Sequence, residues 1–255
     1  MKRIILLIIL LVMSQNIIAQ EATAFQSGER FKFKMSYSGF LKAGNATLEI
    51  IDDTYKGQPV YHVVGKGWTT GAIKWFFRVE DLYESYFDKT SGLPYKFIRK
   101  IDEGGHTKNI EIEFDQENQK AYINNLKHNR KTVEDTKKNV QDLVSAYYYL
   151  RNNYSTEDIK IGDEIALNMF FDSENFNFKL RFLGRDEIRT AFGKVKTLKF
   201  RPLVLAGRVF KEQESLTIWV SADENKIPLR MKASLAVGSL RADLVEYDGL
   251  KYPLD

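Results

Sequence analysis

The chain has 255 residues, a formal charge of +4, and 17 Phe, 13 Tyr and 3 Trp, but no cysteine. Without cysteine we expect neither a disulfide framework nor the lipid anchor of a bacterial lipoprotein, so the fold must be stabilised by its core. Lysines and arginines alternate with acids along the chain, which argues against the concentrated basic surface of a nucleic-acid-binding protein.

The N-terminus has the layout of a secretory signal peptide. Lys2 and Arg3 precede an unbroken apolar run from Ile4 to Met13, which a short polar segment ends. This run is too short for a membrane-spanning helix, which needs roughly 20 apolar residues. We therefore expect a cleaved signal and no transmembrane segment after cleavage.

Cleavage after Ala19 gives a signal peptide over residues 1–19 and a single exported β domain over residues 20–255. Cleavage after Ala24 is the alternative, because a small residue also stands two positions before it. Removal of the signal would lower the formal charge from +4 to +2. The expected product is a soluble periplasmic or secreted protein, not a lipoprotein.

Alternating apolar and polar residues dominate the rest of the chain, as is typical of half-buried strands. Gly-, Asn- and Asp-rich turns separate short runs, so sequential hairpins and antiparallel pairing are predicted. The clearest predicted strands are 30–37, 45–51, 60–65, 95–101, 109–114, 164–171, 176–183, 195–200 and 216–220.

One segment departs from this period. Between Asn139 and Tyr154, apolar residues recur at helical spacing, and Asn139 stands where a helix cap is expected. We predict one amphipathic helix over about residues 139–153, packed against a curved sheet because it cannot bury its apolar face alone. The lysine-rich stretch from Lys127 to Lys138 is the candidate for a mobile loop.

Known catalytic and metal-binding signatures are absent from the sequence. His62, His106 and His128 lie far apart and in unlike contexts, and neither a zinc motif nor a serine or cysteine nucleophile motif occurs. We predict no metal, no cofactor and no catalytic residue. Glu80, Asp81 and Glu84 leave a carboxylate-dependent hydrolase as a weaker alternative, although strand alternation would separate Asp81 from the other two.

Aromatic residues gather between positions 68 and 97, which suggests an apolar concave surface for a hydrophobic ligand. Plain core packing is the alternative. Residues 67–72 read as a loop, and in the adjacent aromatics Trp75, Phe76 and Phe77 at least one side chain should face away from the core. The candidate ligand-binding residues are Trp68, Trp75, Phe77, Tyr83, Tyr86, Phe97 and Tyr148.

Four segments of the chain together carry a resemblance to a known family. They are 77–81 with 83–85, 90–94, 140–151, and 218–223 continuing through Pro228 to 238–240. In these segments the chain resembles the exported bacterial family known as domain of unknown function 3108. The resemblance spans most of the residues after the signal and implies a β-clamshell or half-barrel capped by a helix, similar to the envelope lipoprotein carriers LolA and LolB. It supplies no catalytic residues.

Polar residues also occur beside the apolar stripe of the predicted helix. Asp142 and Arg151 are too far apart to pair with each other on one helix. We expect these two and Ser145 to tether the helix to a strand or loop.

The sequence thus favours a non-enzymatic envelope protein that binds or carries a hydrophobic or lipid-like ligand. A structural or protein-interaction module of the envelope is the main alternative. A wide apolar cavity would favour the carrier, whereas a filled core and a large exposed apolar patch would favour the interaction module.

Overall fold

Fourteen antiparallel strands form one continuous sheet in the computed structural model, which describes residues 23–203, 216–235 and 237–254. The predicted signal peptide, residues 1–19, lies outside these residues. The strands are β1 (Arg30–Tyr37), β2 (Leu41–Tyr55), β3 (Gln58–Thr69), β4 (Val79–Asp88), β5 (Pro94–Glu103), β6 (His106–Asp115), β7 (Lys120–Asn125), β8 (Arg130–Asp135), β9 (Glu164–Phe171), β10 (Glu174–Thr190), β11 (Gly193–Leu203), β12 (Leu216–Ser221), β13 (Pro228–Ser234) and β14 (Ser239–Asp248).

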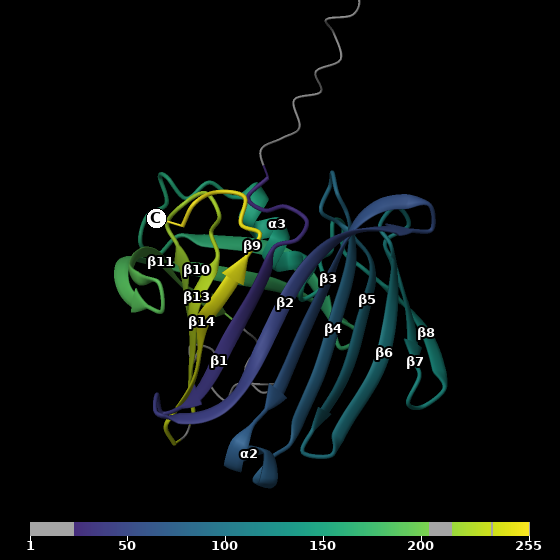
Figure 1. Cartoon of the computed structure of the whole chain (residues 1–255). Coiled ribbons are helices and arrows are strands. Elements are labelled where there is room, and N and C mark those ends of the chain that lie inside the picture. The colour runs from purple at the N-terminus through teal and green to yellow at the C-terminus, as the bar shows by residue number, and fades with distance from the viewer. Residues whose placement is uncertain (1–22, 204–215, 236, 255) are drawn as a thin grey trace, which may run out of the picture.

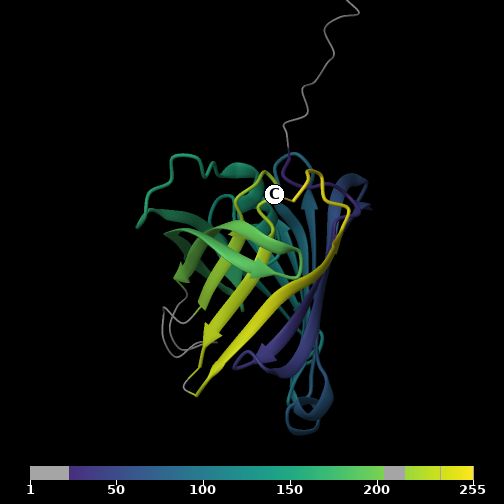
Figure 2. The same cartoon turned by 60° about the vertical axis from the view of Figure 1, so that its left-hand side comes forward.

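The strand order is β8-β7-β6-β5-β4-β3-β2-β1-β14-β13-β12-β11-β10-β9. Strands that are adjacent in sequence therefore pair, except β8 and β9, and β1 and β14 join the two halves by antiparallel pairing. The edge strands β8 and β9 do not pair with each other, so the sheet curves without closing (Figure 1, Figure 2). The predicted half-barrel of sequential hairpins is confirmed, and every strand predicted above lies within an observed strand.

The central helix is shorter than predicted. Helix α3 covers Ser145–Asn153, and the predicted start over residues 139–144 is wrong. Gln141 instead pairs with β9, because its N–H donates to Asn168 O at 2.9 Å and its carbonyl accepts from Phe170 N at 2.9 Å. The carboxylate of Asp142, rather than Asn139, accepts the N–H groups of Val144 and Ser145 just before the helix.

Two predicted loops also contain regular structure. The lysine-rich stretch 127–138 includes β8, which pairs with β7 along its whole length. The segment before β4 forms a short helix, α2 (Gly71–Phe76), in which no residue is buried. Without a buried face this turn of helix has no apolar periodicity, which is the signal that reveals longer helices.

The turns of the sheet alternate between two ends, because neighbouring strands run in opposite directions. The α3 end holds α3, the turns β2–β3, β4–β5, β6–β7, β10–β11 and β12–β13, and the C-terminal residues (Figure 1). The α2 end holds α2 and the turns β1–β2, β5–β6, β7–β8, β9–β10 and β13–β14.

The largest core cluster lies where α3 packs on the concave face. Tyr148 of α3 is buried, with its ring centroid 4.7 Å from that of Phe25 and 5.6 Å from that of Phe87. Phe97 of β5 belongs to the same cluster. This packing fills the α3 end of the curved sheet.

Candidate functional site

A cavity of about 1360 Å³ lies on the concave side of the sheet, between strands of both halves and α3. This volume exceeds the roughly 300–1,000 Å³ of ordinary small-molecule pockets. Apolar side chains dominate its lining, among them Leu150, Phe176, Phe178, Leu180 and Ile218.

The alternation of strand residues creates this lining. On β10, Phe176, Phe178 and Leu180 point to the cavity, while Asn177 between them is exposed. On β12, Ile218 lines the cavity and its neighbour Thr217 does not. These apolar side chains are half-buried because they face an open volume rather than a packed layer.

Charged residues gather in the part of the lining near the α2 end. Arg99 Nη1 lies 2.5 Å from Asp172 Oδ1, and Lys108 Nζ lies 2.8 Å from Asp172 Oδ2. Burial by itself would raise the pKa of Asp172, but the two cations hold that pKa below its ordinary value. The arrangement places two cations against one carboxylate and ties the β9–β10 turn to β5 and β6.

Arg99 is the most enclosed member of this group. Its guanidinium lies 4.7 Å from the ring centroid of Phe171 and 5.8 Å from that of Tyr83. Its buried Nε has no hydrogen-bond partner among the described residues. An acceptor supplied by a ligand would satisfy this donor, since a buried N–H without a partner is unfavourable.

A carboxylate pair lies beside these cations. Burial, followed by the charge of Glu103, raises the pKa of Asp81 to about 6. Glu103 lines the cavity, and so do the exposed His106, Lys127 and His128 at the α2 end. The cavity is therefore polar near the α2 end and apolar toward α3.

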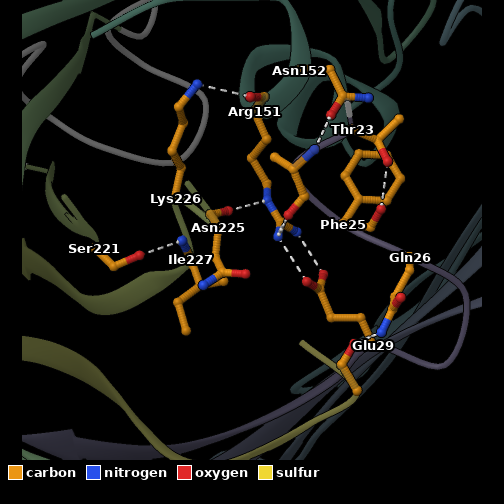
Figure 3. Close-up of polar contacts among 12 residues, drawn as sticks. Thr23, Phe25, Gln26, Glu29, Arg151, Asn152, Ser221, Asn225, Lys226 and Ile227 are labelled. Carbon is orange, nitrogen blue, oxygen red and sulfur yellow. Dashed lines mark hydrogen bonds and ion pairs between the residues drawn. The ribbon is translucent and has the colours of Figure 1, made fainter. Parts of the chain in front are cut away.

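A buried ion pair holds α3 over the other end of the cavity. Arg151 Nη1 and Nη2 donate to the two Glu29 carboxylate oxygens at 2.5 and 2.7 Å, and both side chains are almost completely buried. Arg151 also donates to the carbonyls of Asn225 at 2.8 Å and Ala24 at 3.0 Å (Figure 3). The guanidinium thus links the helix to segments from both ends of the chain.

Two further contacts fix the same helix. Lys226 Nζ donates to the carbonyl of Arg151 at 3.0 Å (Figure 3). It also donates to the carbonyl of Tyr154 at 2.8 Å, where the C-terminal end of α3 presents free acceptors. At the start of the helix, Ser85 Oγ of β4 donates to Asp142 Oδ2 at 2.6 Å. The predicted tethering by Asp142 and Arg151 is confirmed. For Ser145 the prediction is wrong, because its Oγ accepts from Asp142 N at 3.0 Å within the same segment.

The structure does not bring the predicted ligand-binding residues together. Tyr83 lines the cavity, whereas Phe97 and Tyr148 are buried in the core cluster. Trp75 and Phe77 are exposed at the α2 end, so the expectation that at least one aromatic of 75–77 faces away from the core is confirmed. A ligand-binding role for any of these residues stays a prediction.

Trp68 and Tyr86 lie on the opposite face of the sheet. Tyr86 stacks on His62 with ring centroids 4.0 Å apart, and the His62 Nε2 atom lies 2.7 Å from Glu84 Oε2. Trp68 shares the face of His62, because both occupy even positions of β3, which pairs without a register shift. These aromatics are therefore separated from the cavity by the sheet itself.

The predicted acid cluster is divided in the same way. Glu80 pairs with Arg78 at 2.6 Å, a contact that lowers the pKa of Glu80, and Glu84 pairs with His62 on the outer face. Asp81 shares the other face with Tyr83. Among the described residues, no group of three or more His, Cys, Asp or Glu is placed to hold a metal ion.

Apart from Tyr83, sequence reasoning missed the residues that line the cavity. The strand 176–183 was predicted, and its alternation already separates Phe176, Phe178 and Leu180 from the polar residues between them. A search for apolar faces on every predicted strand would have found them. A search for local aromatic density found the segment 68–97 instead.

The family model described as "Protein of unknown function (DUF3108)" matches residues 32–245. A solved β-barrel-like protein of the domain of unknown function DUF1849 from Brucella abortus aligns with a TM-score of 0.57 and 12% identity, over 89% of this chain and all of that chain. This likeness concerns the fold alone. No curated protein gives a significant match.

Weaker structural likenesses extend over similar lengths. A "putative lipoprotein" from Parabacteroides distasonis aligns with a TM-score of 0.36 and 11% identity, over 89% of this chain and 98% of its own. A "putative exported protein" with a YmcC-like fold from Bacteroides fragilis gives 0.32 and 7%, over 88% and 97%. In the described part of the chain, no helix is long and apolar enough to cross a membrane.

Proposed function

We propose that the chain, which belongs to the DUF3108 family, is an exported protein of the cell envelope that binds or carries a hydrophobic, lipid-like ligand without catalysing a reaction. The observation that carries this proposal is the cavity of about 1360 Å³ with its mainly apolar lining. An apolar volume of this size that is accessible to solvent favours burial of an apolar ligand. The signal-like layout of residues 1–19 supports export.

The distribution of charge supports an amphipathic ligand. Arg99 and Lys108 lie near the α2 end, whereas Leu150 and Phe176 line the apolar part. The Nε of Arg99, which has no hydrogen-bond partner among the described residues, can donate to a polar group of such a ligand. In the proposed complex, the apolar chains lie toward α3 and the polar group lies beside Arg99.

A structural or interaction module of the envelope is the second candidate. The observation that favours it is the exposure of Trp75 and Phe76 at the α2 end, where 90% and 87% of these side chains are accessible. Exposed apolar groups of this size on one surface mark contact with another molecule. This candidate and the carrier are compatible, because the exposed residues and the cavity lining are different residues.

The decisive experiment is native mass spectrometry with lipid extraction on protein purified from its own envelope without detergent. Wild-type protein should carry a stoichiometric apolar ligand. Phe178→Glu places a charge in the cavity and should abolish this ligand, whereas Asn177→Glu places the same charge on the exposed face of the same strand and should retain it.

A second pair of variants keeps the test valid if Phe178→Glu protein fails to fold. Ile218→Arg on β12 should also abolish the ligand, while its matched control Thr217→Arg should not. Thermal unfolding checks that all four variants are folded. An apo mass for wild-type protein that persists after incubation with envelope lipids would overturn the carrier proposal.

A further inference from the structure

The most exposed large apolar side chains of the described chain gather at the α2 end. Trp75 and Phe76 are followed in exposure by Phe40 at 84% and Val237 at 77%. These residues come from three connections that are far apart in sequence. We name the set the aromatic rim, and its members are Phe40, Leu41, Trp75, Phe76, Phe77, Leu235 and Val237.

Backbone and side-chain hydrogen bonds hold the connections of the aromatic rim next to one another. Ser38 N donates to Ser239 O at 2.7 Å, and Tyr37 Oη donates to Val237 O at 2.8 Å, which join the β1–β2 and β13–β14 turns. Thr70 N donates to Ala43 O at 3.0 Å, which joins the start of α2 to β2. The rim is therefore a preformed row along one side of the α2 end.

The α2 part of the aromatic rim is also held by the β5–β6 turn. Gly104 N, in the β5–β6 turn, donates to Arg78 O at 2.7 Å. A Cβ atom at Gly104 would lie 2.6 Å from the ring of Phe77, so this glycine allows the aromatic ring to lie close against the turn. Phe77 is consequently half-exposed, while Trp75 and Phe76 project fully into solvent.

Charged residues beside the rim are mainly cationic. In the described turns at the α2 end, Lys74, Arg78 and Lys127 are cationic and Asp172 is acidic. Lys74 and Arg78 both contact one carboxylate, that of Glu80, at 3.9 and 2.6 Å, which leaves one net positive charge beside α2. Fully exposed Trp and Phe beside Lys and Arg are the composition of segments that lie in a membrane interface, where the rings enter the headgroup region and the cations meet anionic lipids. Protein–protein interfaces, by contrast, are depleted in Lys.

We propose that the aromatic rim docks the protein on the surface of a lipid bilayer that contains anionic lipids. The side chains of the aromatic rim project separately into solvent. A lipid bilayer can accommodate such side chains one by one, because its interface is fluid and needs no complementary rigid surface. The cavity reaches the same end, where His106, Lys127 and His128 of its lining are exposed. Docking would bring this end of the cavity to the membrane.

Vesicle flotation tests this proposal with the chain after removal of its signal. Wild-type protein should float with vesicles of equal parts phosphatidylglycerol and phosphatidylethanolamine, and less with phosphatidylcholine vesicles or in about 0.5 M salt. The double variant Trp75→Ser/Phe76→Ser should lower partitioning at least about tenfold. Ile161→Ser is the matched control, because Ile161 is 76% exposed but lies at the α3 end.

The outcomes separate this proposal from the cavity proposal. Phe178→Glu protein should float like wild type even if it has lost its ligand, so each proposal can fail alone. Absence of wild-type protein from the floating fraction, or equal flotation of the double variant, would overturn membrane docking. Membrane docking would also be overturned if the wild-type protein formed a dimer in solution and the double variant were monomeric, because the rim would then bind a second copy of the chain.

Discussion

The two ends of the curved sheet differ in which side chains they bury and which they expose to solvent. At the α3 end, Arg151 and Glu29 are charged yet almost completely buried, and five protein acceptor or donor atoms surround the guanidinium and helix end. At the α2 end, Trp75 and Phe76 are apolar yet almost fully exposed. The chain itself therefore completes the α3 end, whereas no described segment of the chain covers the apolar side chains at the α2 end.

The largest effect should come from breaking the closed end. Arg151→Met leaves the Glu29 carboxylate buried without its cation and should lower the free energy of unfolding by about 3–5 kcal/mol. Urea unfolding measures the change. The double variant Glu29→Met/Arg151→Met should recover part of it, and an equal loss in single and double variants would contradict the role of the ion pair.

The filled and hollow parts of the concave face should respond differently to truncation. Phe97→Ala opens a void in the core cluster and should lower the free energy of unfolding by about 3–5 kcal/mol. Phe178→Ala enlarges an existing cavity, so its loss should be at least about 1 kcal/mol smaller. Equal losses in urea unfolding of the ligand-free protein would mean that the cavity is collapsed in solution.

The start of α3 should give the protein a pH dependence. Burial, opposed by hydrogen bonds from Ser85 and Ser145, raises the pKa of Asp142 to about 6 from an ordinary value near 3.8. The folded state therefore retains this proton longer than the unfolded state does. Its contribution to stability is fully present below about pH 4 and is lost as the pH rises through about 6.

Asp142→Asn tests this dependence, because the amide oxygen can still accept the N–H groups of Val144 and Ser145. Relative to the variant, wild-type protein should lose about 2.5 kcal/mol of unfolding free energy between about pH 4 and pH 7. The other titrating groups cancel in this difference. Parallel stability curves for the two proteins would show that Asp142 has an ordinary pKa.

The smallest effect should appear at the open end. Trp75→Ser should change the free energy of unfolding by less than about 0.5 kcal/mol, because the side chain makes few contacts to lose. Thermal unfolding with and without vesicles is the measurement. A large loss of stability without vesicles would mean that Trp75 packs against the protein in solution, which would remove the contrast between the ends.

Local pattern was enough to predict the strands, because alternation and turn chemistry act over a few residues. Arg30–Tyr37 and Glu164–Phe171 were predicted with their observed bounds. The start of α3 was not, since Val140 is buried in a segment that pairs with β9, and its spacing only imitates a helix. Pairing between distant segments leaves no local period.

The site was harder to predict for the same reason. Local order along the chain does not reveal which face of β3 becomes concave, so Trp68 and Tyr83 looked equivalent although the sheet separates them. Nor does it reveal that Asp172 reaches Arg99, 73 positions away in sequence. Both facts depend on the curvature of the complete sheet.

The pairing of the first strand with the last also has a consequence for folding. Lys32 of β1 meets Glu246 of β14, so the middle of the sheet joins the two ends of the chain. Until the last strand is available, β1 presents an unpaired edge that can recruit another chain. Closing this pair requires a loop of almost the whole protein, which makes folding slow. The central seam of the sheet can therefore form only after the whole segment from β1 to β14 is available.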